Sequence, residues 1–193
     1  MSPDQQSPEY TIHPAHTPTH ILTTRALITA YTNALPLDIS YQNLATELAS
    51  LPGKYSPEEG GIILLATANP PSPSPSPSSD PEPTALGCIA LRTLPPYPIQ
   101  TAEEKAKKIC EIKRLYVVPS ARKMGVGRAL AEAVLRTATE LGYEEVRLDS
   151  LREMRGPRRL YESLGFREVG AYHEVPEVGG LREETLFFGL KLD

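Results

Sequence analysis

Residues 111–130 read as a strand, a tight turn, a glycine-bearing loop and the start of a helix, and they limit the possible folds more than any other stretch of the chain. Residues 112–118 are rich in strand formers, and Pro119 ends the ladder because proline cannot donate a hydrogen bond. The residues after Gly127 are good helix formers with no breaker among them. The stretch therefore predicts a strand–loop–helix unit inside an α/β domain.

The loop of this unit has the properties of a phosphate site. A loop that opens into a helix leaves several backbone N–H groups unpaired, and the helix dipole adds positive potential there. Gly125 and Gly127 let the backbone approach an anion closely, and Arg122, Lys123 and Arg128 surround it with positive charge. We predict a pyrophosphate site.

The glycine spacing separates the phosphate-binding families. A Walker A loop requires Gly-Lys-Ser/Thr at its end, and a dinucleotide fingerprint requires a third glycine where this chain has Leu130. A nucleotide-binding redox domain is disfavoured for the same reason. The spacing Arg122-x-x-Gly125-x-Gly127, after a strand and before a helix, instead resembles the acetyl-CoA loop of the GNAT superfamily of acyl-CoA-dependent N-acyltransferases.

A second motif lies one strand and one helix further along. Residues 160–166, Leu-Tyr-Glu-Ser-Leu-Gly-Phe, resemble the Leu-Tyr-x-x-x-Gly-Phe segment of the same superfamily. Residues 110–119 and the Leu-Asp-Ser-Leu of residues 148–151 are similar to a bacterial and fungal GNAT group of uncertain substrate. The resemblance implies a mixed α/β single domain, with a central, mostly antiparallel sheet that is splayed at the acetyl-CoA strand and flanked by helices.

The resemblance also implies which residues bind the co-substrate, acetyl-CoA. The backbone of Leu115, Tyr116 and Val117 would pair with the pantetheine arm as an added strand would. The pyrophosphate would be held by the loop and the first helical turn, namely by Arg122, Lys123, Met124, Gly125, Val126, Gly127 and Arg128. Lys123 stands where many members have glycine, and we expect that its backbone need not be left-handed.

Two residues are predicted to be catalytic. Tyr161 stands where the family tyrosine donates a proton to the CoA sulfur, although a tyrosine that only packs against Phe166 would fit the pattern too. Glu111 stands where lysine-modifying members carry a general base. Side chains alternate between the two faces of a strand, so Glu111 would share the face of Leu115 if no bulge intervenes. Burial there could raise the pKa of Glu111. The alternative for Glu111 is a salt bridge to Lys113 or Arg114.

The chain order follows from apolar periodicity and breakers. Residues 1–8 are predicted to be disordered, and residues 9–193 to form the N-acetyltransferase domain. We expect strands at residues 10–12, 61–68, 86–94, 112–118, 146–150, 167–175 and 185–192, with 61–68 and 86–94 forming a hairpin. Helices are expected at residues 19–34 (capped by Thr19), 41–51, 102–108, 127–141 (ended by Gly142) and 157–165.

A Pro/Ser-rich segment interrupts the predicted hairpin. Residues 69–84 contain seven prolines and five serines in sixteen residues, which favours an extended, solvated loop over a ladder. A tolerated hairpin insertion explains this segment, and a PxxP-type docking site is the alternative.

Charge and cysteine usage limit the partners. Residues 101–167 carry 15 Lys and Arg against 10 Asp and Glu, a balance of +5, whereas the remainder balances at −9. The basic part holds the predicted phosphate site, which favours a polyanionic co-substrate over nucleic acid.

The thiols of Cys88 and Cys110 lie in apolar runs and are expected to be buried and reduced. Without an apolar run of membrane-spanning length or a signal-peptide core, we expect a cytoplasmic protein that binds no membrane.

The sequence leaves the acceptor open. The four histidines lack ligand spacing, so no metal is expected. We predict transfer of an acetyl group to a primary amine, of a small molecule or of a lysine side chain, by direct attack in a ternary complex. The alternative is a non-catalytic acetyl-CoA-binding sensor or interaction module. The negative charge outside residues 101–167 hints at a cationic acceptor. The protein is expected to be a monomer or a homodimer. Residues expected to contribute to the acceptor pocket are Tyr55, Tyr172, His173 and the acidic stretch 174–184, with Glu58 and Glu59 as alternatives.

Overall fold

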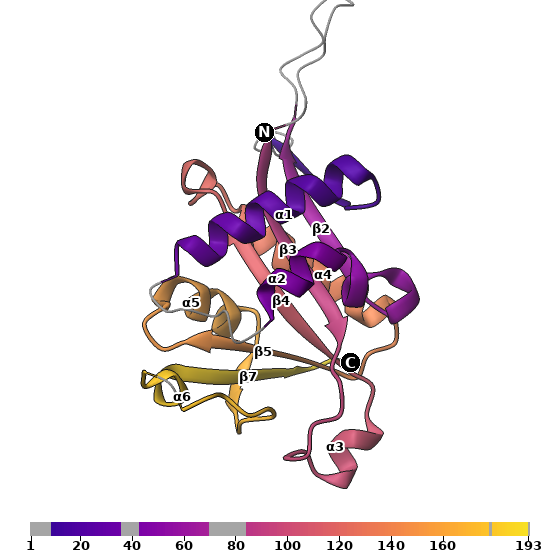
Figure 1. Ribbon diagram of the computed structural model, residues 1–193, viewed down its shortest axis with the longest axis vertical. Coiled ribbons are helices and arrows are strands. Elements are labelled where there is room, and N and C mark those ends of the chain that lie inside the picture. Colours follow the sequence, from indigo (N-terminus) through magenta and orange to yellow (C-terminus); the bar gives the residue numbers. More distant parts are fainter. Residues whose placement is uncertain (1–8, 36–42, 70–83, 178, 193) are drawn as a thin grey trace, which may run out of the picture.

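A seven-stranded sheet in the order β1-β2-β3-β4-β5-β7-β6 organises the protein (Figure 1). The computed structural model describes residues 9–35, 43–69, 84–177 and 179–192. All neighbouring strands are antiparallel except β4 and β5, which are parallel. The predicted mixed α/β fold with a mostly antiparallel sheet is therefore confirmed. The strands are β1 (Tyr10–Pro14), β2 (Ile62–Ala68), β3 (Ala85–Thr93), β4 (Ile109–Val117), β5 (Glu145–Leu151), β6 (Arg167–Val169) and β7 (Thr185–Lys191).

The sheet opens between β4 and β5. These strands pair only from Ile109 opposite Glu145 to Glu111 opposite Arg147, although both continue beyond these pairs. The register of β4 against β3 also shifts at Arg114, which has a φ of 59°. A β-bulge of this kind adds a residue to one strand and bends it. The bulge and the early end of pairing together produce the expected splay.

Glycine is required where β3 approaches the bulged strand. A Cβ on Gly87 would lie 2.5 Å from the carbonyl oxygen of Tyr116. Any larger residue would push the two strands apart just beyond the bulge.

Helices cover both faces of the sheet (Figure 1). Helices α1 (Pro18–Asn33) and α2 (Leu44–Ser50) lie on one face. Leu27 and Ile28 of α1, and Leu51 just after α2, pack there against Leu65 and Cys88. Helix α4 (Val126–Glu140) lies on the other face. The remaining helical elements are α3 (Ala102–Ala106), α5 (Arg155–Ser163) and α6 (Leu181–Glu184), with short 3₁₀ turns at Gly53–Tyr55, Pro57–Glu59 and Pro119–Ala121.

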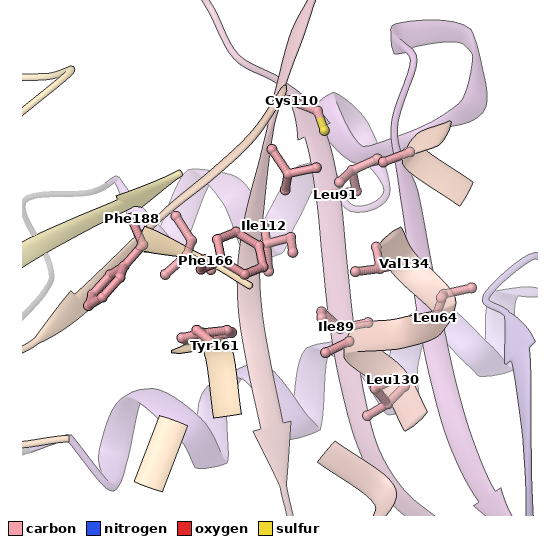
Figure 2. Packing of buried hydrophobic residues seen from close by; sticks show 14 of the residues in the cluster. Leu64, Ile89, Leu91, Cys110, Ile112, Leu130, Val134, Tyr161, Phe166 and Phe188 are labelled. Atoms are coloured by element: carbon pink, nitrogen blue, oxygen red, sulfur yellow. The ribbon is translucent and has the colours of Figure 1, made fainter. Parts of the chain in front are cut away.

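The amphipathic pattern of α4 explains its place. Leu130, Val134 and Ala138 form a buried stripe at helical spacing, and they pack against Leu64 and Ile89 of the sheet (Figure 2). Gly142, with a φ of 73°, follows the C-cap of the helix as predicted. This packing fixes the N-terminus of α4 beside the splayed end of β4.

Several boundaries differ from the sequence-based expectation. Thr17 caps α1, not Thr19, because Pro18 takes the first helical position and the Thr17 hydroxyl accepts from the N–H of His20. The strand expected at residues 167–175 ends at Val169, because the chain then leaves the sheet and buries Tyr172. Helix α6 was not predicted. The hairpin of β2 and β3 is confirmed.

Residues 41 and 42 of the helix expected at 41–51 and most of two other predicted segments lie outside the described residues. The two segments are residues 1–8 and, apart from its end residues Asn69 and Thr84, the Pro/Ser-rich insertion. Within the described part of the chain, no helix has the length and apolar character needed to cross a membrane.

Candidate active site

An elongated cavity of about 430 Å³ follows the splayed end of β4. It is lined by five of the residues predicted to bind acetyl-CoA: Leu115, Tyr116, Val117, Arg122 and Gly127. The opposite wall comes from the end of α1 and from α5, with Tyr31, Leu35, Met154, Pro157 and Leu160. We call this cavity the β4 slot. Because β4 pairs with β5 only as far as Glu111, its backbone groups beyond this point have no strand partner on the β5 side among the described residues and are available to an extended ligand.

The glycine loop closes one end of the β4 slot. Among the described residues, no carbonyl or side chain accepts a hydrogen bond from the backbone N–H of Gly125, Val126, Gly127 or Arg128. These four groups lie at the N-terminus of a 15-residue helix, where the dipole favours an anion.

The side chains of the loop lie in different environments. Met124 is 40% exposed, and Lys123 is exposed as well. Val126 is buried in the core, so only its N–H faces the loop. Arg128 donates to the Ser163 hydroxyl at 2.6 Å, and Arg122 donates to the carbonyl of Val117 at 3.4 Å. The residues predicted for the pyrophosphate are therefore gathered around one helix N-terminus.

The expectation for Lys123 was wrong. Its φ is 71°, in the left-handed region, because the turn that follows Pro119–Ala121 reverses the chain before α4 begins. A side chain in this region costs roughly 1 kcal/mol, which explains why glycine suits the position in related loops.

Tyr161 lies outside the lining of the β4 slot, although its neighbour Leu160 lines that slot. It projects from α5 and packs edge-on against Phe166, with ring centroids 5.7 Å apart (Figure 2). It also lines a smaller cavity of about 60 Å³ between the diverging strands, with Leu115 and Asp149. We call this the splay cavity. Burial raises the pKa of the Tyr161 phenol well above its ordinary value, so the hydroxyl keeps its proton near neutral pH.

The bulge moves Glu111 away from the face predicted for it. Leu115 and Val117 pack with the α4 side of the core, whereas Glu111 faces Arg92 and Lys113 on the other side. Glu111 is fully buried, and its carboxylate accepts from Arg92 at 2.8 Å and from the Tyr172 hydroxyl at 2.9 Å. Burial alone would raise the pKa of Glu111, but Lys113 and Arg92 outweigh it and hold the pKa below its ordinary value. The expected rise is thus corrected, and the salt bridge to Lys113, at 3.4 Å, is present.

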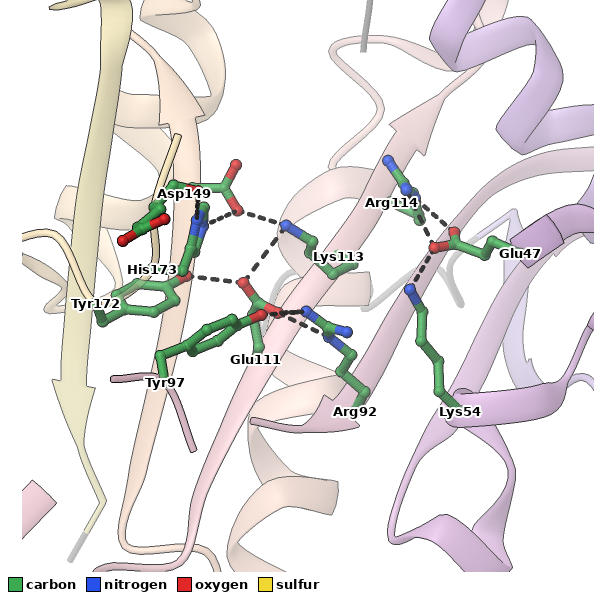
Figure 3. A network of polar contacts seen from close by, with 11 residues as sticks. Glu47, Lys54, Arg92, Tyr97, Glu111, Lys113, Arg114, Asp149, Tyr172 and His173 are labelled. Atoms are coloured by element: carbon green, nitrogen blue, oxygen red, sulfur yellow. Dashed lines mark hydrogen bonds and ion pairs between the residues drawn. The ribbon is translucent and has the colours of Figure 1, made fainter. Parts of the chain in front are cut away.

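A third cavity, of about 430 Å³, lies beyond the splay cavity. Two sets of ion pairs supply its charged walls (Figure 3). The Glu111 group contains Glu111, Arg92, Lys113, Asp149, Tyr172 and His173. The Glu47 group contains Glu47, Lys54 and Arg114. No hydrogen bond or ion pair joins the two groups in Figure 3, and the cavity has members of both in its lining. We call it the polar cavity.

The three cavities adjoin one another. The splay cavity shares Leu115, Met154 and Pro157 with the β4 slot, and it shares Lys113 and Arg114 with the polar cavity. A co-substrate in the β4 slot and an acceptor in the polar cavity would therefore meet at the point where β4 and β5 diverge.

The Glu111 group includes a set of possible metal ligands that the sequence spacing did not reveal. Ligand atoms of Glu111, Asp149 and His173 lie within 4.8 Å of one another. The Lys113 ammonium already supplies a positive charge there, 2.6 Å from Asp149 and 3.4 Å from Glu111. Asp149 and Glu111 raise the pKa of Lys113 despite its burial, so this charge is retained at neutral pH. The expectation that the protein uses no metal stays a prediction.

His173 is the histidine that lines the polar cavity among the described residues. Its Nδ1 lies 3.0 Å from the carbonyl oxygen of Glu174, and its Nε2 lies 3.9 Å from Asp149. Burial alone would lower the pKa of His173, but Asp149 and the Glu174 carbonyl raise it above its ordinary value. With Nδ1 as the donor, Nε2 is the basic nitrogen of the neutral ring.

Sequence reasoning found part of this site. Of the residues expected to contribute to the acceptor pocket, Tyr55, His173 and Glu174 line the polar cavity, whereas Tyr172, Glu58 and Glu59 do not. That these residues bind an acceptor stays a prediction. Sequence reasoning missed Glu47, Lys54, Arg92, Lys113, Arg114 and Asp149, because their partners lie on other elements and no local motif marks them. One sequence feature could have indicated these residues, namely the high density of charged residues in and beside strands that are otherwise apolar. Cys88 and Cys110 are free and buried as predicted, and burial raises the pKa of Cys88 to about 12.

Comparisons with known proteins agree with this architecture. The family model of the acetyltransferase (GNAT) family matches residues 55–166. An uncharacterised N-acetyltransferase of Schizosaccharomyces pombe is 30% identical over 152 residues, which are 79% of this chain and 79% of the relative. An uncharacterised N-acetyltransferase of Dictyostelium discoideum is 24% identical over 220 residues, covering 87% of this chain and 93% of the relative.

Solved structures show the same fold. A GNAT acetyltransferase of Staphylococcus aureus superposes with a TM-score of 0.67 at 17% identity, covering 95% of this chain and 99% of that one. Arabidopsis thaliana NAA60, solved in complex with acetyl-CoA, superposes with a TM-score of 0.63 at 17% identity, covering 95% of this chain and 98% of that one. The chain belongs to the GNAT acetyltransferase family and is an acyltransferase.

Proposed function

We propose that the protein transfers an acetyl group from acetyl-CoA to a primary amine by direct attack within a ternary complex. The observation that carries this proposal is the row of three adjoining cavities along β4. The β4 slot would receive the pantetheine arm, the loop N–H groups the pyrophosphate, and the polar cavity the acceptor. The relative from Arabidopsis thaliana, solved with acetyl-CoA, supports this choice of co-substrate.

The reaction then needs one bond formed and one broken at the thioester carbon. The neutral amine attacks this carbon, and the carbonyl oxygen gains negative charge that backbone N–H groups of β4 near Val117 would stabilise. Collapse of the tetrahedral species breaks the C–S bond. Tyr161, which retains its proton because it is buried, donates that proton to the CoA thiolate. The nitrogen releases its second proton as it becomes an amide, and this proton restores the Tyr161 hydroxyl, so the proton count balances. No covalent enzyme intermediate is involved.

The acceptor must first lose a proton from its ammonium group. We assign this step to His173, which lines the polar cavity and whose imidazolium form is stabilised by Asp149. Glu111 was the candidate from the sequence, but its carboxylate is already engaged by Arg92, Lys113 and Tyr172. We therefore propose that Glu111 is a positioning residue that holds Lys113 and Arg92 at the acceptor side.

The family relationship favours an enzyme over a non-catalytic acetyl-CoA-binding module, since two relatives that match 79% and 87% of this chain are named N-acetyltransferases. One further relative, 34% identical over 85 residues and spanning 31% of that protein, is named N-acetylaspartate synthetase. Its name refers to an acetylated amine that carries carboxylates.

A small-molecule amine and a lysine side chain both remain within the proposal, as do a monomer and a homodimer. The two reduced thiols fit a cytoplasmic location.

The proposal is tested by titrating acetyl-CoA into the wild type, Arg122→Glu and Arg136→Glu, with NADH as a ligand control. Arg122 lines the β4 slot, whereas Arg136 is an exposed arginine of α4 outside the slot lining. We expect acetyl-CoA to bind the wild type, and Arg122→Glu to weaken binding by about tenfold or more through repulsion of the phosphates. Arg136→Glu should bind as the wild type does. A folded protein that binds NADH and not acetyl-CoA would overturn the proposal.

A further inference from the structure

The Glu47 group carries more positive than negative charge. The group has one carboxylate, Glu47, and two cations, and all three residues line the polar cavity. Glu47 pairs with Arg114 at 2.7 Å and with Lys54 at 2.6 Å. Burial alone would raise the pKa of Glu47, but these two cations lower it to about 2, so Glu47 is ionised near neutral pH. Burial lowers the pKa of Lys54, and the ion pair with Glu47 opposes this and favours the charged ammonium. One positive charge is thus left without a counter-charge at the wall of the polar cavity.

The opposite wall does not compensate this charge. In the Glu111 group, Arg92 and Lys113 balance Glu111 and Asp149, and His173 adds positive charge when it is protonated. Glu174 also lines the cavity, but it is exposed at the rim, where solvent screens it. The interior of the polar cavity therefore has a surplus of about one positive charge.

Donors on both walls remain open. The Arg114 guanidinium uses Nε and Nη2 for Glu47, and the Arg92 guanidinium uses Nε and Nη2 for Glu111 and Tyr97. Their Nη1 groups have no acceptor among the described residues. The buried hydroxyl of Tyr55, which also lines the polar cavity, has no hydrogen-bond partner there either. Buried donors of this kind are normally satisfied, and an anionic ligand would satisfy them.

We propose that the acceptor amine carries a carboxylate, and that Lys54 and Arg114 bind this carboxylate in the polar cavity while the amine points toward the splay cavity. The proposal rests on the proposed function and specifies its substrate class. A single surplus charge suits a singly charged carboxylate better than a doubly charged phosphate. A polyamine would instead have to enter between four cations. The charges of the cavity thus favour the opposite of the cationic acceptor that the overall acidity suggested.

The test compares amines that differ only in the carboxylate. Glycine, 4-aminobutyrate and glutamate are each assayed against the corresponding carboxyl amide, with spermidine added, and rates of CoA release are corrected for the unprotonated fraction of each amine. The variants are Lys54→Gln and, as a matched control, Lys105→Gln. Lys54 is 38% exposed, and Arg114 still pairs with Glu47 in its absence, so Lys54→Gln should fold. Lys105 lies on α3, outside the lining of all three cavities.

We expect at least one carboxylate to exceed its amide by about tenfold or more in kcat/KM, and Lys54→Gln to reduce this ratio by about three- to tenfold. Lys105→Gln should leave the ratio unchanged. Equal or faster acetylation of the amides or of spermidine would overturn the carboxylate proposal and leave the proposed function standing.

A second measurement separates the two proposals. Glutarate, a dicarboxylate without an amine, is titrated into the CoA-saturated protein and into the protein alone. Binding that weakens in Lys54→Gln but not in Lys105→Gln supports the carboxylate site even if none of the chosen amines is acetylated. Absence of glutarate binding together with absence of turnover of the carboxylate amines would overturn it. A protein that fails to bind acetyl-CoA would refute the proposed function, and the glutarate titration would still decide the carboxylate site.

Discussion

The Arg114 guanidinium donates two hydrogen bonds to the Glu47 carboxylate, at 2.7 and 3.1 Å. Arg114 is the bulge residue of β4, with a φ of 59°, and Glu47 lies on α2. Both side chains are almost completely buried. The pair therefore anchors an unfavourable backbone conformation of the central strand to a helix 67 residues away in the sequence.

The pair should make stability depend on acid pH. The pKa of Glu47 is about 2 in the folded protein and 4.5 as the ordinary value, so the ionised carboxylate stabilises the fold above pH 4.5, and this contribution is lost as the pH falls toward 2. We expect Glu47→Gln to lower the free energy of unfolding by on the order of 3 kcal/mol at pH 7. Near pH 2 the variant and the wild type should be equally stable.

Denaturant unfolding at several pH values checks this prediction. Glu103→Gln is the control, because Glu103 forms an exposed pair with Lys107 and should change stability by less than about 0.5 kcal/mol. A constant difference between wild type and Glu47→Gln from pH 7 to pH 2 would contradict the role assigned to the ionised pair.

Tyr161→Phe should separate catalysis from binding. The variant keeps the ring that packs against Phe166 and removes only the hydroxyl. We expect kcat to fall by about 100-fold, since general acid catalysis typically contributes that much or more, with little change in acetyl-CoA affinity.

Tyr143→Phe provides the matched control. Its hydroxyl donates to the Gly60 carbonyl at 2.7 Å, and neither residue lines the splay cavity, so its loss should cost about 1 kcal/mol of stability and leave kcat unchanged. If Tyr161→Phe were as active as Tyr143→Phe, the tyrosine would have only a packing role.

The parts of this fold that the sequence predicted are those determined locally. The glycine loop, the helix after it and the hairpin of β2 and β3 follow from breakers and from apolar periodicity, which depend on neighbouring residues. The bulge at Arg114 does not, because it depends on Glu47, a partner contributed by another element. Once the bulge is missed, strict alternation places Glu111 on the wrong face of β4.

The acceptor side was hidden for a related reason. Tyr172 was expected in a long closing strand, but the chain leaves the sheet after Val169, and this brings Tyr172 and His173 against Glu111 and Asp149. Such a change of direction has no local signature. The charges of the polar cavity likewise come from separate strands and helices, so only the folded chain shows that cations outnumber carboxylates there.

The two glycines of the phosphate loop should respond differently to alanine. Gly125 has a φ of 82°, and Gly125→Ala should destabilise the fold by about 1–2 kcal/mol because a Cβ is disfavoured in that region. A Cβ on Gly127 would lie 3.5 Å from Val117 and 3.9 Å from Leu160, which are ordinary contacts. Gly127→Ala should therefore be neutral or stabilising by up to about 1 kcal/mol, since alanine favours the helix. Thermal unfolding of both variants tests this, and equal losses would refute it.

His173→Gln should remove a titration step from the activity. Only the neutral imidazole of His173 can take a proton from the ammonium group of the substrate amine. The pKa of His173 lies above the ordinary 6.5 because Asp149 stabilises the charged form. In the wild type, kcat/KM should therefore fall as the pH decreases through this raised pKa. His173→Gln should lack that step and be about 100-fold slower on the high-pH plateau.

The control is His16→Gln, since His16 is exposed and lies outside the lining of the three cavities, and it should keep the wild-type profile. If His173→Gln kept that profile as well, the proton would leave the acceptor by another route, and the Glu111 carboxylate would again be the candidate base.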